Sequence, residues 1–211
     1  SNTSGVHLGF RFAFDQIGDS LTKVRVTEKG YVSLMSQKLS FNVYSSAFID
    51  DTSNMTSPNH SVWYRSSTHG HDLDAISRRI NRGFYKGNSS RLLFKAANAF
   101  VVTWEKQRVA YELTENYNTF QLIFASDERG ERSFVIYNYD HCDLAATRAS
   151  VPLGFSGTSL NWDGSVTNNS IINDHSPPFR FYGRETNVDA PGQFIYLVYD
   201  KSEHIFAITL Y

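Results

Sequence analysis

The sequence predicts a mainly β fold, an antiparallel two-sheet sandwich with one short amphipathic helix, at about residues 72–83, packed on it. Three observations lead to this fold class. Sixteen Phe and twelve Tyr favour sheet, because aromatic side chains fit a half-buried pleated surface. Most apolar segments alternate with a period of two, which is typical of strands. Helical spacing of apolar residues is clear in one segment.

The composition limits the classes of function. With 211 residues, 41% of them hydrophobic and 19% charged, the chain can bury a sizeable core, and we interpret residues 1–211 as a single domain. The net charge of −1 supplies no positive field, so no nucleic-acid partner is expected. No apolar run approaches the roughly 20 residues of a membrane span, so we expect no direct membrane insertion.

The first third of the chain is predicted to form strands. Residues 9–14 (GFRFAF) alternate apolar with small or polar residues and indicate an edge strand. Residues 21–26 and 31–34 indicate a hairpin, in which Gly30 takes the positive φ of a tight turn. After a polar loop, residues 61–66 (SVWYRS) resume as a strand.

The helix is predicted from its apolar spacing and its ends. Leu73, Ile76 and Ile80 recur at i, i+3 and i+7. Asp72 is expected to be the N-cap and Gly83 the C-cap glycine. Three arginines fall mainly on the outer side of this helix: Arg78, Arg79 and Arg82. A solvated face is the simpler interpretation of these arginines, and the hypothesis kept beside it is an interaction face.

The middle of the chain predicts the core. Residues 99–104 (AFVVTW) form a continuous apolar run and indicate a central strand, followed by strands at 119–126 and 133–139 joined by a compact loop around Gly130. Phe120, Leu122 and Phe124 share one face of the first of these, and Phe134 and Ile136 lie opposite Val135, Tyr137 and Tyr139 in the second. Because both faces are apolar, both must be covered, which predicts two packed sheets with the helix closing one side.

The last third is predicted to be looser. Residues 152–170 contain Gly154, Gly157 and Gly164 in quick succession and are interpreted as a loop-rich region. Residues 192–200 and 204–211 indicate two more alternating strands.

The single cysteine and the glycosylation sequons bear on the compartment. Cys142 cannot form an internal disulfide, so it is either a small buried hydrophobe or paired with a segment outside this chain. The chain carries five N-x-S/T sequons, all in segments interpreted as loops, where a glycan is tolerated: Asn2, Asn54, Asn59, Asn88 and Asn168. The sequons favour an extracellular location.

Three loop clusters are candidate ligand sites. Asp50, Asp51 and Asp163 could supply oxygen ligands for calcium, although turn-forming residues are the favoured interpretation and no cofactor is otherwise expected. Trp162 beside Asp163 would suit a sugar. The run His69-Gly70-His71-Asp72 could hold zinc, but a protein site needs three or four ligands, so we favour a structural role.

The sequence does not indicate an enzyme. It has no G-x-S-x-G motif and no phosphate-binding glycine loop. Cys142 has only the adjacent His141 as a catalytic-looking neighbour. Glu105, Glu112 and Glu115 are close in sequence, but they lie in a segment of solvated, loop-like character rather than as a catalytic carboxylate pair.

The central block nevertheless resembles a known family. "AFVVTWEKQ" and "NTFQLIFASDERGERSFVIYNYD" are similar to the core signature of the nidogen-like (NIDO) domain, through residues 100–104, 118–127 and 133–139. Flanking pieces follow in the family's order: "FRFAF", "VRVTEKGYVSL", "FIDDT", "SVWYR", "LGFS" and "APGQFIYLVYD". "FIDDT" is shorter than the family's acidic strand end, and the segment after Tyr139 departs from its pattern.

This resemblance implies a non-catalytic extracellular module for adhesion or matrix assembly, as in nidogens, tectorins and membrane mucins. It implies extracellular-matrix or cell-surface proteins as partners, and a parent chain with neighbouring EGF-like, sushi or von Willebrand-type modules. The alternative from another class is a calcium-assisted carbohydrate-binding β-sandwich that uses the loop around Trp162 and Asp163.

Overall fold

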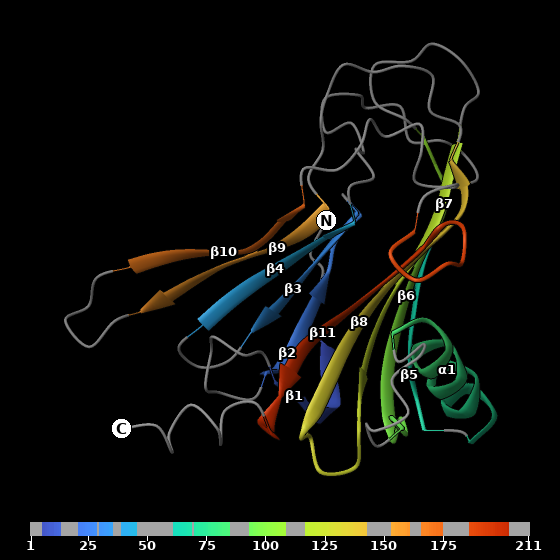
Figure 1. The fold of residues 1–211 in the computed structure, drawn as a ribbon. Helices are drawn as coiled ribbons and strands as arrows, with labels where there is room; N and C mark the ends of the chain where they lie inside the picture. The colour runs from blue at the N-terminus through green and yellow to red at the C-terminus, as the bar shows by residue number, and fades with distance from the viewer. Residues whose placement is uncertain are drawn as a thin grey trace.

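In the residues that the computed structural model describes, two antiparallel sheets and the helix α1 make up the fold (Figure 1). The structure describes residues 6–13, 21–28, 30–35, 39–45, 61–68, 70–84, 93–108, 117–142, 153–160, 166–174 and 186–202. The predicted mainly β architecture, with two packed sheets and a helix on one side, is confirmed.

The six-stranded sheet has the order β1-β2-β3-β4-β9-β10. Its strands are β1 (Val6–Phe12), β2 (Leu21–Val26), β3 (Tyr31–Met35), β4 (Leu39–Ser45), β9 (Leu153–Leu160) and β10 (Val166–Asp174). The predicted edge strand is β1, and the predicted hairpin is β2–β3, with Gly30 at a φ of 78°. The hairpin is confirmed, and the edge strand is confirmed with different bounds, since β1 begins three residues before the predicted strand and ends at Phe12.

The five-stranded sheet has the order β11-β8-β7-β6-β5. Its strands are β5 (Ser61–Ser67), β6 (Asn98–Arg108), β7 (Tyr117–Ser126), β8 (Arg132–Cys142) and β11 (Gln193–Asp200). The apolar run 99–104 lies in β6, which has a neighbour on each side, as a central strand requires. Gly130, at a φ of 66°, turns the chain between β7 and β8.

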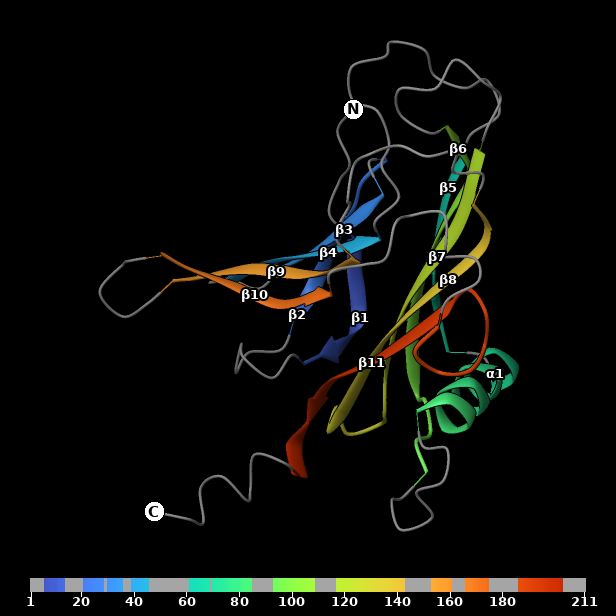
Figure 2. The ribbon, with the colours of Figure 1, turned by 45° about the horizontal axis from the view of Figure 1, so that its top comes forward.

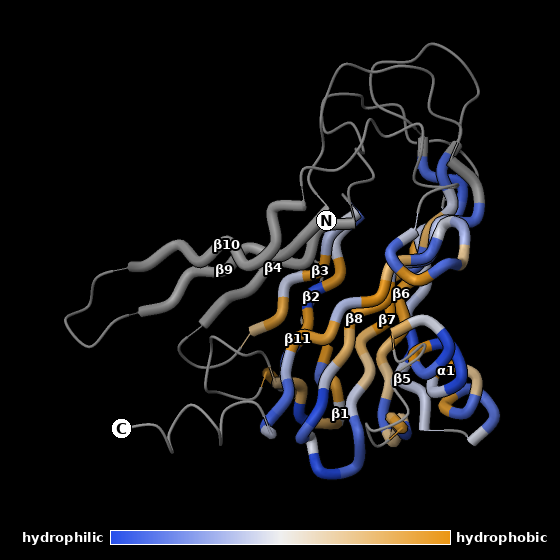
Figure 3. Tube along the Cα trace, in the orientation of Figure 1, coloured by the Kyte–Doolittle hydropathy of each residue, from blue (hydrophilic) through white to orange (hydrophobic). Residues whose placement is uncertain are grey.

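The main core lies between the two sheets. The predicted face of Phe120, Leu122 and Phe124 is buried there, together with the side of β8 that carries Val135, Tyr137 and Tyr139. Trp104 is fully buried and stacks on Phe120 with ring centroids 5.0 Å apart. Its indole Nε1 donates to the Thr27 carbonyl oxygen at 2.8 Å, which satisfies the one polar atom of the ring in this apolar layer. Figure 3 shows the apolar strands that enclose this layer.

A second apolar layer lies on the other face of the five-stranded sheet, under α1 (Gly70–Gly83) (Figure 2). Leu73, Ile76 and Ile80 are buried against it, so the predicted apolar side of the helix is confirmed. Phe134 and Ile136, on the opposite side of β8 from Tyr137, belong to this layer. The five-stranded sheet is therefore the middle layer of three.

The predicted ends of the helix are partly wrong. The helix begins at Gly70, so Asp72 lies in its first turn rather than at the N-cap. Gly83 is the last helical residue and is not among the described glycines with positive φ, so it does not form a left-handed C-cap. A Cβ atom on Gly83 would lie 2.6 Å from Val188 Cβ. The position needs glycine because the segment before β11 approaches the helix closely there.

The predicted loop-rich region at 152–170 is also wrong in part, because β9 and β10 form a hairpin within it. The small and polar residues of these strands do not show the apolar alternation from which a strand is predicted. Their backbone groups are paired nonetheless, since β9 lies between β4 and β10. Two glycines of β9, Gly157 and Gly154, lie in register with Phe41 and Tyr44 of β4. Asn168 pairs in register with Thr158, so this sequon lies on an edge strand and not in a loop. The strand predicted at 204–211 lies outside the described residues.

The close contact at Gly83 gives a stability test. We expect Gly83→Ala to lower the free energy of unfolding by about 1–3 kcal/mol, because the new methyl group must displace the base of the Val188 side chain. Gly70→Ala is the matched control, since a Cβ atom there meets nothing within 4 Å and alanine favours the helix. Urea unfolding of both variants measures the difference, and equal stability of the two would contradict the packing argument.

Candidate interaction surface

The helix-covered face of the five-stranded sheet changes from apolar to polar along its strands. Val101, Ile123, Ile136 and Ile195 lie side by side across β6, β7, β8 and β11, and all four are buried in the layer under α1. On the same face, two residues away from each of these in one direction across the sheet, lies a second row of register partners, which are polar: Thr103, Gln121, Asn138 and Gln193. These four residues are called the polar row below.

The side chains of the polar row form a continuous chain of hydrogen bonds. Gln121 Nε2 donates to Thr103 Oγ1 at 2.9 Å. Asn138 Nδ2 donates to Gln121 Oε1 at 3.2 Å, and Gln193 Nε2 donates to Asn138 Oδ1 at 2.8 Å. Each amide therefore has a fixed orientation, and each keeps a second N–H donor that no described residue accepts. All four side chains are half-buried, so water or a ligand can reach them.

Trp63 extends this row onto the edge strand β5. It lies in register with Thr103, and 63% of its surface is exposed. Its indole Nε1 donates to Glu105 Oε2 at 3.2 Å. The neighbouring Tyr64 lies in register with Val102 and contacts the Phe100 ring at 6.0 Å, so it belongs to the opposite face of the sheet. The hydrogen bond to Glu105 thus positions an exposed aromatic ring at the end of the polar row.

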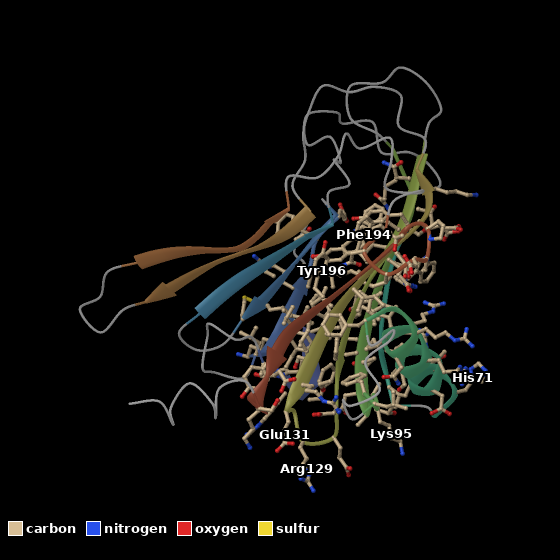
Figure 4. The ribbon with its side chains drawn as sticks, viewed as in Figure 1. His71, Lys95, Arg129, Glu131, Phe194 and Tyr196 are labelled. Carbon is tan, nitrogen blue, oxygen red and sulfur yellow. The ribbon has the colours of Figure 1, made fainter. Side chains whose placement is uncertain are left out.

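The start of α1 is bound to the end of β5 by Asp72. Its carboxylate accepts from the Arg65 guanidinium and from Ser67 Oγ, the latter at 2.9 Å. These two hydrogen bonds, with Arg65 the stronger cause, lower the pKa of Asp72 below its ordinary value. Asp72 is engaged in holding the helix to the sheet, and His71 beside it is exposed and projects away from the sheets (Figure 4).

The three arginines predicted as a possible interaction face, Arg78, Arg79 and Arg82, are all exposed on α1. Among the described residues, no carboxylate lies within ion-pair distance of any of them. Because Leu73, Ile76 and Ile80 fix the other side of the helix in the core, these guanidinium groups extend from a rigid support.

Several predicted site residues lie outside the described part of the chain: Asp50, Asp51, Trp162, Asp163, His69, Glu112, Glu115, Asn2, Asn54, Asn59 and Asn88. Cys142 is the last residue of β8. Glu105 is bonded to Trp63 and is not paired with a second described carboxylate. No group of three or more metal-binding side chains occurs among the described residues. Within the same residues, no helix combines the length and apolar character that a membrane crossing requires.

The polar row and the exposure of Trp63 were not predicted from the sequence. The available signal was a polar residue following the apolar residues of one face in each of four strands. Placing those polar residues side by side requires the register, and the register depends on bulges that the sequence does not mark, such as the one between Trp104 and Gln107.

Comparison with known proteins gives one finding. The family model of the nidogen-like domain matches residues 22–200. Domains of this family occur in extracellular proteins and are in general non-enzymatic. No curated protein and no solved structure matches the chain significantly.

The Asp72 contacts predict a pH dependence. Since the pKa of Asp72 is lowered by folding, its contribution to stability is complete above the ordinary aspartate pKa and is lost as the pH falls through the lowered value. Asp72→Asn is therefore expected to reduce stability at pH 7, with a difference from the wild type that narrows at pH 2–3. Urea unfolding at both pH values measures this. A difference that stays constant with pH would show that the charge of Asp72 is not involved.

Proposed function

Because the chain belongs to the nidogen-like domain family, we propose that it is an extracellular adhesion or matrix-assembly module that acts through protein–protein contact and not through catalysis. The family assignment supports the extracellular location, and the five sequons agree with it. In this proposal residues 1–211 form one module of a mosaic parent chain that also carries EGF-like, sushi or von Willebrand-type modules. Its partners are matrix or cell-surface proteins.

The observation that carries protein contact is the exposed arginine face of α1. Arginine presents a planar fork of donors that matches carboxylates bidentately, and three such groups on a fixed helix offer several charge-assisted hydrogen bonds. An exposed arginine is solvated by water in the unbound protein. Its pairing with a carboxylate of a partner therefore contributes most to the binding free energy when the contact excludes water. The partner surface that fits this face is acidic.

Glycosylation supports the same choice of face. Glycans on occupied sequons would exclude protein contact from their surroundings, and none of the five sequons lies in α1. The calcium-assisted sugar site proposed around Trp162 and Asp163, with Asp50 and Asp51 as further calcium candidates, gains no support from any described residue.

Charge reversal on the helix tests the proposal. We expect Arg78→Glu with Arg82→Glu to weaken capture by an acidic partner at least tenfold, because contacts between charged groups contribute about 1.5–3 kcal/mol each when desolvated. Lys23→Glu with Arg129→Glu is the matched control: both residues are exposed, and the change in net charge is the same, but they lie on β2 and in the β7–β8 loop.

The measurement is binding of the wild type and both variants to an array of purified matrix proteins and cell-surface ectodomains, in calcium and in EDTA. Capture that survives the control and is lost with the helix variant supports the proposal. Capture that is equal for both variants would place the contact elsewhere, and absence of any protein partner would count against the adhesion function.

A further inference from the structure

We infer that the polar row, together with Trp63 and Glu105, is a binding platform for a neutral oligosaccharide and does not need calcium. This site lies on the five-stranded sheet and uses none of the three arginines of α1. It does not rest on the proposed protein contact, and either can fail without the other.

The exposed indole of Trp63 is the first observation. A large aromatic side chain that stays 63% exposed leaves a substantial apolar surface in water. Its Nε1 is already bonded to Glu105, so the ring has a fixed edge and an accessible apolar body. The C–H face of a pyranose ring is a flat, weakly apolar surface of matching size, and ligand sites commonly combine such an aromatic contact with a few fixed polar groups.

The chemistry of the row is the second observation. A sugar hydroxyl both donates and accepts, and so do a carboxamide and a threonine hydroxyl. Gln121, Asn138 and Gln193 each have a second N–H donor available to a ligand, and their orientations are fixed by the bonds within the row. Fixed side chains lose little rotamer freedom on binding, which lowers the cost of capturing a weakly held ligand.

The charge of the surroundings selects a neutral ligand. The row itself contains no cation, and Arg65, two residues after Trp63 on β5, is paired with Asp72. Glu105 beside Trp63 is anionic and repels sulfate or carboxylate groups. An acidic polysaccharide is therefore expected to bind the arginine face of α1 and not the polar row.

The extent of the platform fits an oligosaccharide better than a single sugar. Trp63 and the polar row occupy five adjacent strands, which spans about 19 Å at the usual strand spacing. The row is level and continuous because the four residues are direct register partners. A protein partner, in contrast, is expected to seek a broader apolar centre than one indole provides.

The test is an array of neutral oligosaccharides, with sulfated and sialylated glycans as separate arms, probed with the purified chain in EDTA. Trp63→Ala is expected to lower the affinity for the bound neutral glycans at least tenfold, and Gln121→Ala several-fold. Tyr64→Ala is the matched control, because Tyr64 is an adjacent half-exposed aromatic residue on the opposite face of β5. The affinity of this variant for the neutral glycans should stay within twofold of the wild type. Thermal unfolding confirms that each variant is folded.

A second readout does not depend on the variants. Titration of the best neutral glycan should shift the indole N–H resonance of Trp63 and the side-chain amide resonances of Gln121 and Asn138. The inference is overturned if no neutral glycan binds, if binding requires calcium, or if Trp63→Ala and Tyr64→Ala bind equally well. Binding confined to sulfated or sialylated glycans, and lost with the Arg78 and Arg82 reversal, would also overturn it.

Discussion

The structure depends on covering both faces of the five-stranded sheet. Strands β7 and β8 carry apolar side chains on alternate sides, so neither face can be left in water without a large cost. The six-stranded sheet covers one face with β1, β2 and β3, and α1 covers the other. Phe194 and Tyr196 of β11 extend the first layer towards the edge (Figure 4).

The candidate sites follow from where this cover ends. The layer under α1 buries Val101, Ile123, Ile136 and Ile195, and the next residues on the same face are half-buried and polar. The apolar side of the helix is used for the core, and its arginines are therefore all available on the other side. Both proposed surfaces lie on the helix-bearing side of the molecule, and they differ in chemistry: one is cationic, the other neutral with an aromatic end. The two proposals together would let the module engage protein and carbohydrate separately.

Much of the fold could be predicted because the apolar pattern of the central strands shows which of their faces are buried. The two-sided burial of β8 was evident from Phe134 and Ile136 against Val135 and Tyr137, and α1 from Leu73, Ile76 and Ile80. The hairpin β9–β10 could not be predicted, since the glycine and serine residues of β9 form a strand through their backbone pairing with β4. Gly83 looked like a cap because local sequence does not reveal that Val188, more than 100 residues away, approaches it. The arginine face was predicted from helical spacing alone, but the polar row required the register of four strands.

The sheet topology also determines how the module carries mechanical load. β1 is an edge strand of one sheet and β11 is an edge strand of the other, so a pull applied between them acts on two different sheets. The Lys201 backbone N–H and ammonium both bond to Glu131, which ties the far end of β11 to the β7–β8 loop. Tension applied between β1 and β11 therefore loads the aromatic layer between the sheets as well as the edge hydrogen bonds of β1 to β2 and of β11 to β8. In a mosaic protein under strain, the core around Trp104 would be the joint that transmits force from one sheet to the other.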